Sequence, residues 1–271
     1  MAAQKKTISI AGCCRHLGIS KQVYYKSQKN QTKQKEEQEN IIRKVLSVRQ
    51  EQPRLGTRKL HYILKAELGV GRDKLFEILR EEQMLITKRR KYVKTTNSKH
   101  WMRIYADSSK QLELKQPEQL WVADITYLST RQETLYLHLV SDAYSKQIMG
   151  YTLSKDLKSE STVKALQMAL RRRVYQNRNI LHHSDRGLQY CSRIYIDELL
   201  RNNCQISMTQ DGSPYDNAVA ERINGILKDE FYYDEKFDSF EQAKNHIEQS
   251  IMIYNTTVSY THLTLPTSDL V

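Results

Sequence analysis

Three carboxylates, Asp124, Asp185 and Glu221, occupy positions from which they could jointly bind metal ions. Asp124 lies inside LWVADITYL, an apolar run that is typical of a buried strand. Asp185 ends a second apolar run, NILHHSD. Carboxylates are rarely buried unless they are paired or bound to a metal. Three acids on three elements of one domain therefore favour a metal site, and ligands that are all oxygen favour Mg²⁺ or Mn²⁺ over zinc.

Glu221 belongs to a segment, SPYDNAVAERINGILKDEF, that predicts an amphipathic helix starting at Ser213. Ser213, Pro214 and Asp216 predict a capping-box start with proline at the first helical position. At about 100° per residue, the helix has an apolar face and an opposite polar face. The apolar face holds Val219, Ile223, Ile226 and Leu227, and the polar face holds Asn217, Glu221, Asn224 and Lys228. Because most surface helices have an exposed polar face, this helix alone does not identify a site.

The segments around the three acids, WVADITYL, HHSDRGLQY and DGSPYDNAVAER, resemble the Asp-Asp-Glu triad of the retroviral-integrase superfamily. Thirty-five residues separate Asp185 from Glu221 (221 − 185 − 1 = 35), which matches that family's spacing. Lys228 matches a basic residue that many members carry seven residues after the glutamate. From about residue 8 to residue 257, the chain is similar to the second-frame (OrfB-type) transposases of copy-out, paste-in insertion sequences.

The resemblance implies a DNA transposase that cleaves and joins strands with two divalent ions, Mg²⁺ or Mn²⁺, held by Asp124, Asp185 and Glu221. Two such ions typically lie roughly 3.5–4 Å apart. The implied partners are insertion-sequence terminal inverted repeats and target DNA, other copies of the chain in a synaptic complex, and a first-frame protein as a possible fusion partner. Candidate DNA contacts near the triad are His183, Tyr215, Asn217 and Lys228. For His183, a structural role at a strand end is an equal alternative.

The composition of the 271 residues limits the function classes. Lys+Arg exceed Asp+Glu by 43 − 31 = 12, which favours a polyanionic partner such as nucleic acid, although a merely basic soluble protein is the alternative. No stretch approaches the ~18 apolar residues of a membrane span, and the N-terminus lacks a signal-peptide pattern. The four cysteines lack CxxC spacing and suggest packing thiols. We expect a cytoplasmic, nucleoid-associated bacterial protein.

The front of the chain predicts small all-α modules. In residues 1–30, a helix up to Leu17, a break at Gly18 and a cap at Ser20 predict a helix-turn-helix, with a plain helical hairpin as the alternative. This unit offers Lys21, Gln22 and Tyr24 as DNA contacts. Polar residues 28–40 predict a linker or the solvated start of the next helix. Three helical stretches then form a winged-helix-like module over 36–95 by resemblance.

The remainder predicts an α/β catalytic core over 115–257. Strands at 120–128, 134–141 and 147–153 should form an antiparallel meander, followed by alternating helices and strands. This is the order of an RNase H-like core with a mixed five-stranded sheet. Ser159 or Ser161 should cap the first helix, and Asp142 is interpreted as a turn-forming acid. Basic residues 87–119 predict a DNA contact or a solvated linker.

Residues 258–271 depart from the resembling family and predict a non-native tail. VSYTHLTLPT can be back-translated as an adapter used in sequencing libraries, whereas a divergent natural tail is the alternative. For function, a DNA-binding regulator without activity and a simple RNase H-like nuclease are the alternatives to a transposase. A helix-turn-helix would favour site-specific DNA over the nuclease.

Overall fold

The chain forms two compact units, one of residues 1–50 with 55–86, and the other of residues 51–54 with 87–271. The computed structural model describes residues 9–86, 102–110, 112–210, 217–231, 233 and 235–261. The predicted basic stretch up to Trp101 therefore lies outside the described residues. Within the described part of the chain, no helix is both long and apolar enough to cross a membrane.

The first unit is helical, as predicted. Its helices are α1 (Ile10–His16), α2 (Lys21–Glu51), α3 (Thr57–Ile63), α4 (Lys65–Leu68) and α5 (Arg72–Glu81). Ser9 caps α1 by accepting a hydrogen bond from the Gly12 N–H, and Gly18 follows the helix at φ +66°, a conformation that glycine adopts readily. The small core of this unit contains Val45, Leu60 and Leu75.

The predicted linker over residues 28–40 is part of a helix. Helix α2 continues from Lys21 to Glu51 without a break, so the alternative of a solvated helix start is the correct one. Its first buried residue is Ile41, which lies beyond the polar segment. The two front modules predicted over 1–30 and 36–95 therefore share one helix.

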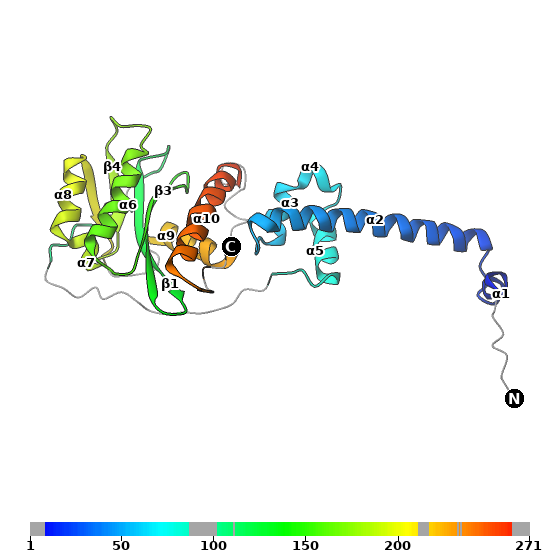
Figure 1. Ribbon diagram of the computed structural model, residues 1–271. Helices are drawn as coiled ribbons and strands as arrows, with labels where there is room; N and C mark the ends of the chain where they lie inside the picture. The colour runs from blue at the N-terminus through cyan, green and yellow to red at the C-terminus, as the bar shows by residue number, and fades with distance from the viewer. Residues whose placement is uncertain are drawn as a thin grey trace. The chain divides into compact units, whose positions relative to one another are not determined.

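The second unit is built on a mixed sheet in the order β3-β2-β1-β4-β5, which confirms the predicted fold class (Figure 1). Its strands are β1 (Leu120–Thr130), β2 (Thr134–Asp142), β3 (Ile148–Ser154), β4 (Ile180–Ser184), β5 (Cys204–Met208) and the short β6 (Lys236–Phe237). Strands β1, β2 and β3 form the expected antiparallel meander, while β4 runs parallel to both β1 and β5. The sixth strand, which pairs with the end of β1, was not predicted.

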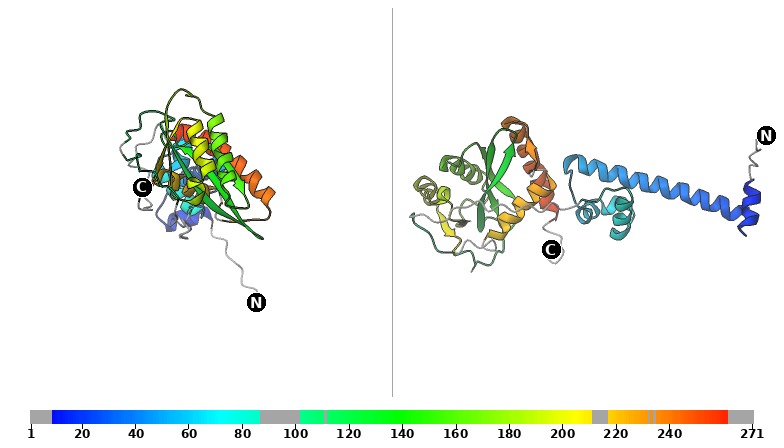
Figure 2. Two further views of the ribbon diagram at one scale, coloured as in Figure 1. Left: turned by 90° about the vertical axis from the view of Figure 1, so that its left-hand side faces the viewer. Right: turned by 90° about the horizontal axis from the view of Figure 1, so that it is seen from below.

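Helices cover both faces of this sheet (Figures 1 and 2). They are α6 (Ser159–Arg171), α7 (Leu188–Cys191), α8 (Arg193–Arg201), α9 (Ala218–Glu230) and α10 (Phe240–Thr261). One core packs α6, α7 and α8 around Trp121, and the other packs α9 and α10 around Leu137. One sheet with a helical layer on each face fixes β1 and β4, the strands that position the two aspartates.

Two predicted helix starts are wrong. Lys158 is the N-cap of α6, and no side chain caps this helix, so neither Ser159 nor Ser161 does so. Helix α9 begins at Ala218 with Asn217 as its N-cap, later than predicted. The expected capping box around Ser213 lies outside the described residues. Helix α10 extends to residue 261, into the segment predicted as a non-native tail, and residues 262–271 lie outside the described part.

Candidate active site

Asp124 and Asp185 lie side by side because of the register between two parallel strands. Strand β4 pairs with β1 up to Ser184 opposite Ala123, and the next residue of each segment is an aspartate, Asp124 within β1 and Asp185 just after β4. In a parallel pair, residues in register project to the same face of the sheet. The two carboxylates therefore occupy neighbouring positions at the point where β4 leaves the sheet, as expected for two ligands of one site.

The two aspartates interact electrostatically. Burial and the neighbouring Asp185 carboxylate raise the pKa of Asp124 from 3.8 to about 7, while its hydrogen bonds and Lys228 oppose this rise. Raised carboxyl pKa values of this kind arise where like charges share a partly desolvated site. A bound cation would favour the charged form of both groups. The pair is therefore suited to a divalent metal ion.

Helix α9 is joined to β1 beside Asp124 through two asparagines of its polar face. The Nδ2 of Asn224 donates to Oδ2 of Asp124 at 2.6 Å, and the Nδ2 of Asn217 donates to the Ala123 carbonyl at 3.2 Å. Both side chains are buried, and the Oδ1 of each has no hydrogen-bond partner within the described residues. Two buried oxygen acceptors of these asparagines are thus unsatisfied among the described residues. The sequence placed Asn224 on this face, but its bond to Asp124 is a tertiary contact without a local signal.

Glu221 lies on the same helical side as these asparagines, four residues after Asn217 and three before Asn224. Its side chain is exposed, and partial burial raises its pKa. The structure brings Asp124 and Asp185 together but does not show Glu221 in contact with them. Among the described residues, no group of three or more His, Cys, Asp or Glu is arranged to hold a metal ion.

Lys228 lies near Asp124 at the other end of this polar face. Burial lowers the pKa of Lys228, and the Asp124 carboxylate opposes that shift. In this arrangement its ammonium offsets part of the charge of the aspartate pair. Tyr215, the other predicted contact near Glu221, lies outside the described residues.

The expected DNA contact by His183 is not supported, because this side chain is only 1% exposed. Its Nδ1 forms a hydrogen bond of 2.8 Å with the Ser207 hydroxyl and lies 3.8 Å from the Asp107 carboxylate. These contacts fix the segment before β1 against strands β4 and β5. The structural alternative for this histidine is therefore the correct one, since a buried ring cannot reach a phosphate.

Asp142 is a turn-forming acid, as interpreted from the sequence. Its Oδ1 accepts hydrogen bonds from the backbone N–H groups of Tyr144 and Ser145, and its Oδ2 accepts one from the N–H of Glu118. The predicted contacts of the first unit lie near the start of α2, where Lys21 and Gln22 are exposed and Tyr24 is half-buried.

Sequence reasoning assigned no role to Tyr190, which follows Asp185 in HHSDRGLQY. This tyrosine is buried, and its hydroxyl has no hydrogen-bond partner among the described residues. Burial and the charges of Asp124 and Asp185 raise the pKa of the phenol. The two carboxylates are therefore close enough to favour the neutral form of this phenol.

The sheet order and the paired aspartates define an RNase H-like catalytic domain of the integrase type. The Integrase core domain family matches residues 115–214, and a second family with the same description matches residues 202–258. The chain is 34% identical over 247 residues to the "Insertion element IS600 uncharacterized 31 kDa protein" of Shigella sonnei, which covers 89% of this chain and 90% of that protein. The chain belongs to the insertion-sequence transposases with an integrase-like core.

Two further similarities are more limited in extent or identity. The chain is 42% identical to transposase InsF of insertion sequence IS3A from Escherichia coli strain K12 over 136 residues, 49% of this chain and 47% of InsF. The structure of the HTLV-2 integrase catalytic core domain in complex with magnesium has 19% sequence identity and a TM-score of 0.40. That likeness covers 50% of this chain and 84% of the integrase chain.

Proposed function

We propose that this chain is a DNA transposase that cuts and joins DNA strands with divalent cations bound by Asp124, Asp185 and Glu221. The observation that carries the proposal is the aspartate pair, with a pKa of Asp124 raised to about 7, at the end of β4. Membership in the transposase family supports DNA as the substrate. The basic excess of 43 − 31 = 12 charges is consistent with it.

The donor atoms fit Mg²⁺ or Mn²⁺, which prefer oxygen ligands. The buried Oδ1 atoms of Asn217 and Asn224, which lack partners among the described residues, would act as acceptors for metal-bound water. Two such ions would activate the attacking water or 3′-hydroxyl and stabilise the leaving 3′ oxygen. No side chain of the triad then has to act as a nucleophile.

The chain's own residues position these groups. Asn224 orients Asp124 through its 2.6 Å hydrogen bond. Glu221, which projects from the same side of α9, would complete the ligand set from its exposed position by a change of its side-chain conformation. With cations bound to the aspartates, Lys228 would be able to contact a DNA phosphate as a point charge. Tyr215 and Asn217 are proposed as neighbouring strand contacts, and Lys21, Gln22 and Tyr24 as contacts of the front unit.

Transposition needs two DNA ends to be brought together, so we propose that at least two copies act in a synaptic complex. A fusion with a first-frame protein is a further proposal that follows from the OrfB-type resemblance.

The test uses the variant Glu221→Gln, which removes one charge with little change in size. We expect it to abolish Mg²⁺-dependent cleavage and strand transfer while leaving binding to the terminal DNA of the element largely intact in a mobility shift. Glu241→Gln, at an exposed site on α10, is the matched control and should retain activity. Strand transfer at the normal rate by the Glu221 variant would refute the assignment. Failure of the unchanged protein to bind or join the terminal DNA would refute the function.

A further inference from the structure

The loop between α6 and β4 forms a basic surface to which the proposed site gives no role. Together with the last residue of α6 it reads RRRVYQNR, from Arg171 to Arg178, with four arginines and no acid, and we call this segment the arginine loop. The side chains of Arg171, Arg172 and Arg178 are exposed, whereas that of Arg173 is only 8% exposed. Three exposed arginines therefore lie within eight residues (178 − 171 + 1 = 8), and one of them, Arg172, also donates to the Met149 carbonyl at 3.4 Å.

A buried ion pair holds the arginine loop in place. Glu118 accepts hydrogen bonds from the backbone N–H groups of Val174, at 2.8 Å, and Tyr175, at 3.1 Å. The Nε of Arg173 lies 3.8 Å from Oε2 of Glu118, and its Nη2 donates to the carbonyls of Tyr175 and Arg178. One arginine of the four is thus used inside the loop, where it fixes the backbone that carries the other three.

Glu118 itself is held in an unfavourable backbone conformation. It has φ +61°, a left-handed value that is uncommon outside glycine, and its N–H donates to Oδ2 of Asp142 at 2.6 Å. Buried ion pairs contribute little net stability, because desolvating both charges offsets most of their attraction. The main effect of this arrangement is therefore to give a surface loop a fixed shape. Fixed loops on a rigid scaffold commonly carry binding residues.

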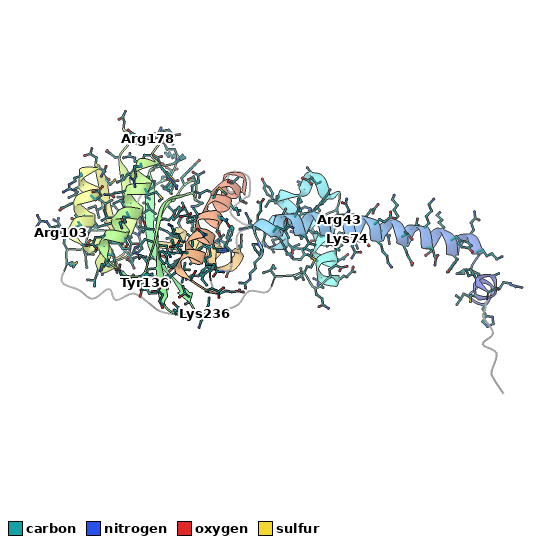
Figure 3. The ribbon with its side chains drawn as sticks, viewed as in Figure 1. Arg43, Lys74, Arg103, Tyr136, Arg178 and Lys236 are labelled. Atoms are coloured by element: carbon teal, nitrogen blue, oxygen red, sulfur yellow. The ribbon has the colours of Figure 1, made fainter. Side chains whose placement is uncertain are left out.

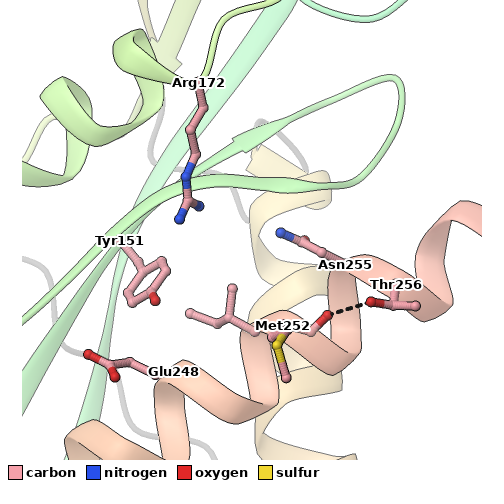
Figure 4. Close-up of a pocket in the computed structure, with 7 residues that line it drawn as sticks. Tyr151, Arg172, Glu248, Met252, Asn255 and Thr256 are labelled. Atoms are coloured by element: carbon pink, nitrogen blue, oxygen red, sulfur yellow. Dashed lines mark hydrogen bonds between the residues drawn. The ribbon is translucent and has the colours of Figure 1, made fainter.

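The outward arginines are not neutralised by neighbouring acids. Arg171, Arg172 and Arg178 form no ion pair within the described part of the chain. The guanidinium of Arg178 lies 3.9 Å from the centre of the Tyr175 ring, which restrains it. Arg172 lines an open pocket of about 480 Å³, where Figure 4 shows its guanidinium on one side of Tyr151 and the Glu248 carboxylate on the other.

The arginine loop and Asp185 lie at opposite ends of strand β4. It precedes Ile180, the first residue of β4, whereas Asp185 follows the last residue of that strand. At about 3.3 Å per residue, the seven positions from Arg178 to Asp185 span roughly 20 Å. Figure 3 shows Arg178 at one end of the unit and Lys236, next to the end of β1, at the other. The loop is therefore separate from the reacting atoms.

We propose that the arginine loop binds the phosphates of duplex DNA at a distance from the cleaved or joined position. This inference rests on the proposed function, because it takes DNA as the ligand. The planar fork of arginine matches phosphate oxygens, and fixed guanidinium groups lose less freedom on binding than mobile ones. Backbone phosphates carry no sequence information, so the surface would accept any duplex. The duplex could be the element's own DNA behind its end or the target DNA.

The test measures how DNA binding depends on salt, in EDTA, so that no chemistry occurs. Two fluorescent duplexes of about 40 base pairs are titrated between about 50 and about 300 mM NaCl, one with the element's terminal sequence and one scrambled. Each phosphate contact contributes about 0.9 to the slope of log K against log salt, so R171Q/R172Q/R178Q should flatten it by about 3. A flatter slope for this variant on both duplexes or on one supports the proposal. If the slope is flatter on one duplex only, that duplex identifies which DNA the loop binds.

The control variant R131Q/K155Q/K158Q removes the same number of charges from side chains that already pair with Asp238, Glu133 and Asp156. Its slope should change by less than about 1. The charge-preserving variant R171K/R172K/R178K should keep the slope of the unchanged protein. If the triple glutamine variant unfolds, the single R178Q variant should still flatten the slope by about 1.

If the triple glutamine variant has the same slope as the control variant, this inference is overturned but the proposed function is not. The same holds if the glutamine variant changes self-association while its slope equals that of the control. Absence of binding to either duplex by the unchanged protein would overturn the proposed function together with this inference. The two failures are therefore distinguishable in one set of titrations.

Discussion

The variant Asp124→Asn should make the metal-free protein more stable, because it removes a charge that the fold holds at a cost. The pKa of Asp124 is raised from 3.8 to about 7. Since the folded pKa is above the unfolded one, the native state binds more protons in that window, and this group's contribution to stability falls as the pH rises through it. At about 1.4 kcal/mol per pKa unit, the penalty above pH 7 is at most about 4 kcal/mol. Partial exposure reduces this, so we expect a gain of about 2 kcal/mol.

Thermal unfolding in EDTA measures this effect. For a unit of this size, about 2 kcal/mol corresponds to a rise in Tm of roughly 4–8 °C at pH 8. At pH 5, where Asp124 is protonated in the folded state, the rise should be about a third as large. Adding Mg²⁺ should raise the Tm of the unchanged protein, because a ligand that binds only the folded state stabilises it, but should have little effect on the variant.

Asp142→Asn is the matched control and should change stability in the opposite direction. Asp142 accepts four hydrogen bonds, three at Oδ1 and one at Oδ2, and an amide cannot accept all of them. We expect a loss of about 1–3 kcal/mol. An unchanged or lower Tm for the Asp124 variant at pH 8, or an equal rise at pH 5 and pH 8, would contradict the explanation from charge repulsion and burial.

Three further predictions concern the scaffold. Gly150→Ala places a Cβ 2.1 Å from the Ala165 carbonyl oxygen, so urea unfolding should show a loss of about 3 kcal/mol, and an undiminished midpoint would contradict that packing. Burial lowers the pKa of His138 to about 4 and that of His182 to about 3. The stability that each neutral histidine contributes is therefore present above 6.5, the pKa of histidine in the unfolded chain, and is lost as the pH falls below it. By pH 5, each histidine should lower the free energy of unfolding by about 2 kcal/mol. Urea unfolding of the Asp124→Asn variant measures this, and a urea midpoint that does not change with pH would contradict it. Glu118→Gln leaves the Arg173 guanidinium buried without its charged partner, so Tm should fall by an amount equivalent to about 3 kcal/mol. Trypsin should also cleave the arginine loop faster in this variant. Unchanged cleavage would mean that Glu118 does not hold the loop.

The elements that carry Asp124 and Asp185 could be predicted because their signals are local. An apolar run of strand length contains Asp124 and another precedes Asp185, and short turns join β1 to β2 and β2 to β3 as expected. The register that sets the two aspartates side by side follows from the parallel pairing of β1 with β4, which the RNase H-like order implies. The position of Glu221 relative to the pair remains a prediction, since it depends on the tertiary placement of α9.

Other features had no local signal or a misleading one. Residues 28–40 lack an apolar stripe, which suggested a linker, yet they contain no glycine or proline and continue α2 as helix formers. Strand β6 has only two residues and depends on pairing with β1. The burial of His183 depends on Asp107 and Ser207, which are far from it in the sequence. For strand β6 and for His183, a tertiary contact decided the outcome over the local pattern, whereas residues 28–40 follow local helix propensity.

The polar face of α9 explains how a helix can serve both packing and chemistry. A solvated face would leave Asn217 and Asn224 in water, but both are buried and donate to β1. Each amide uses its donor in the fold and leaves its oxygen without a partner among the described residues, which costs free energy in a buried position. The raised pKa of Asp124 indicates a cost of the same sign at the same place. A cation with its bound water would relieve both costs, so the folded protein is destabilised where we propose that the ligand binds, and metal binding would restore that stability.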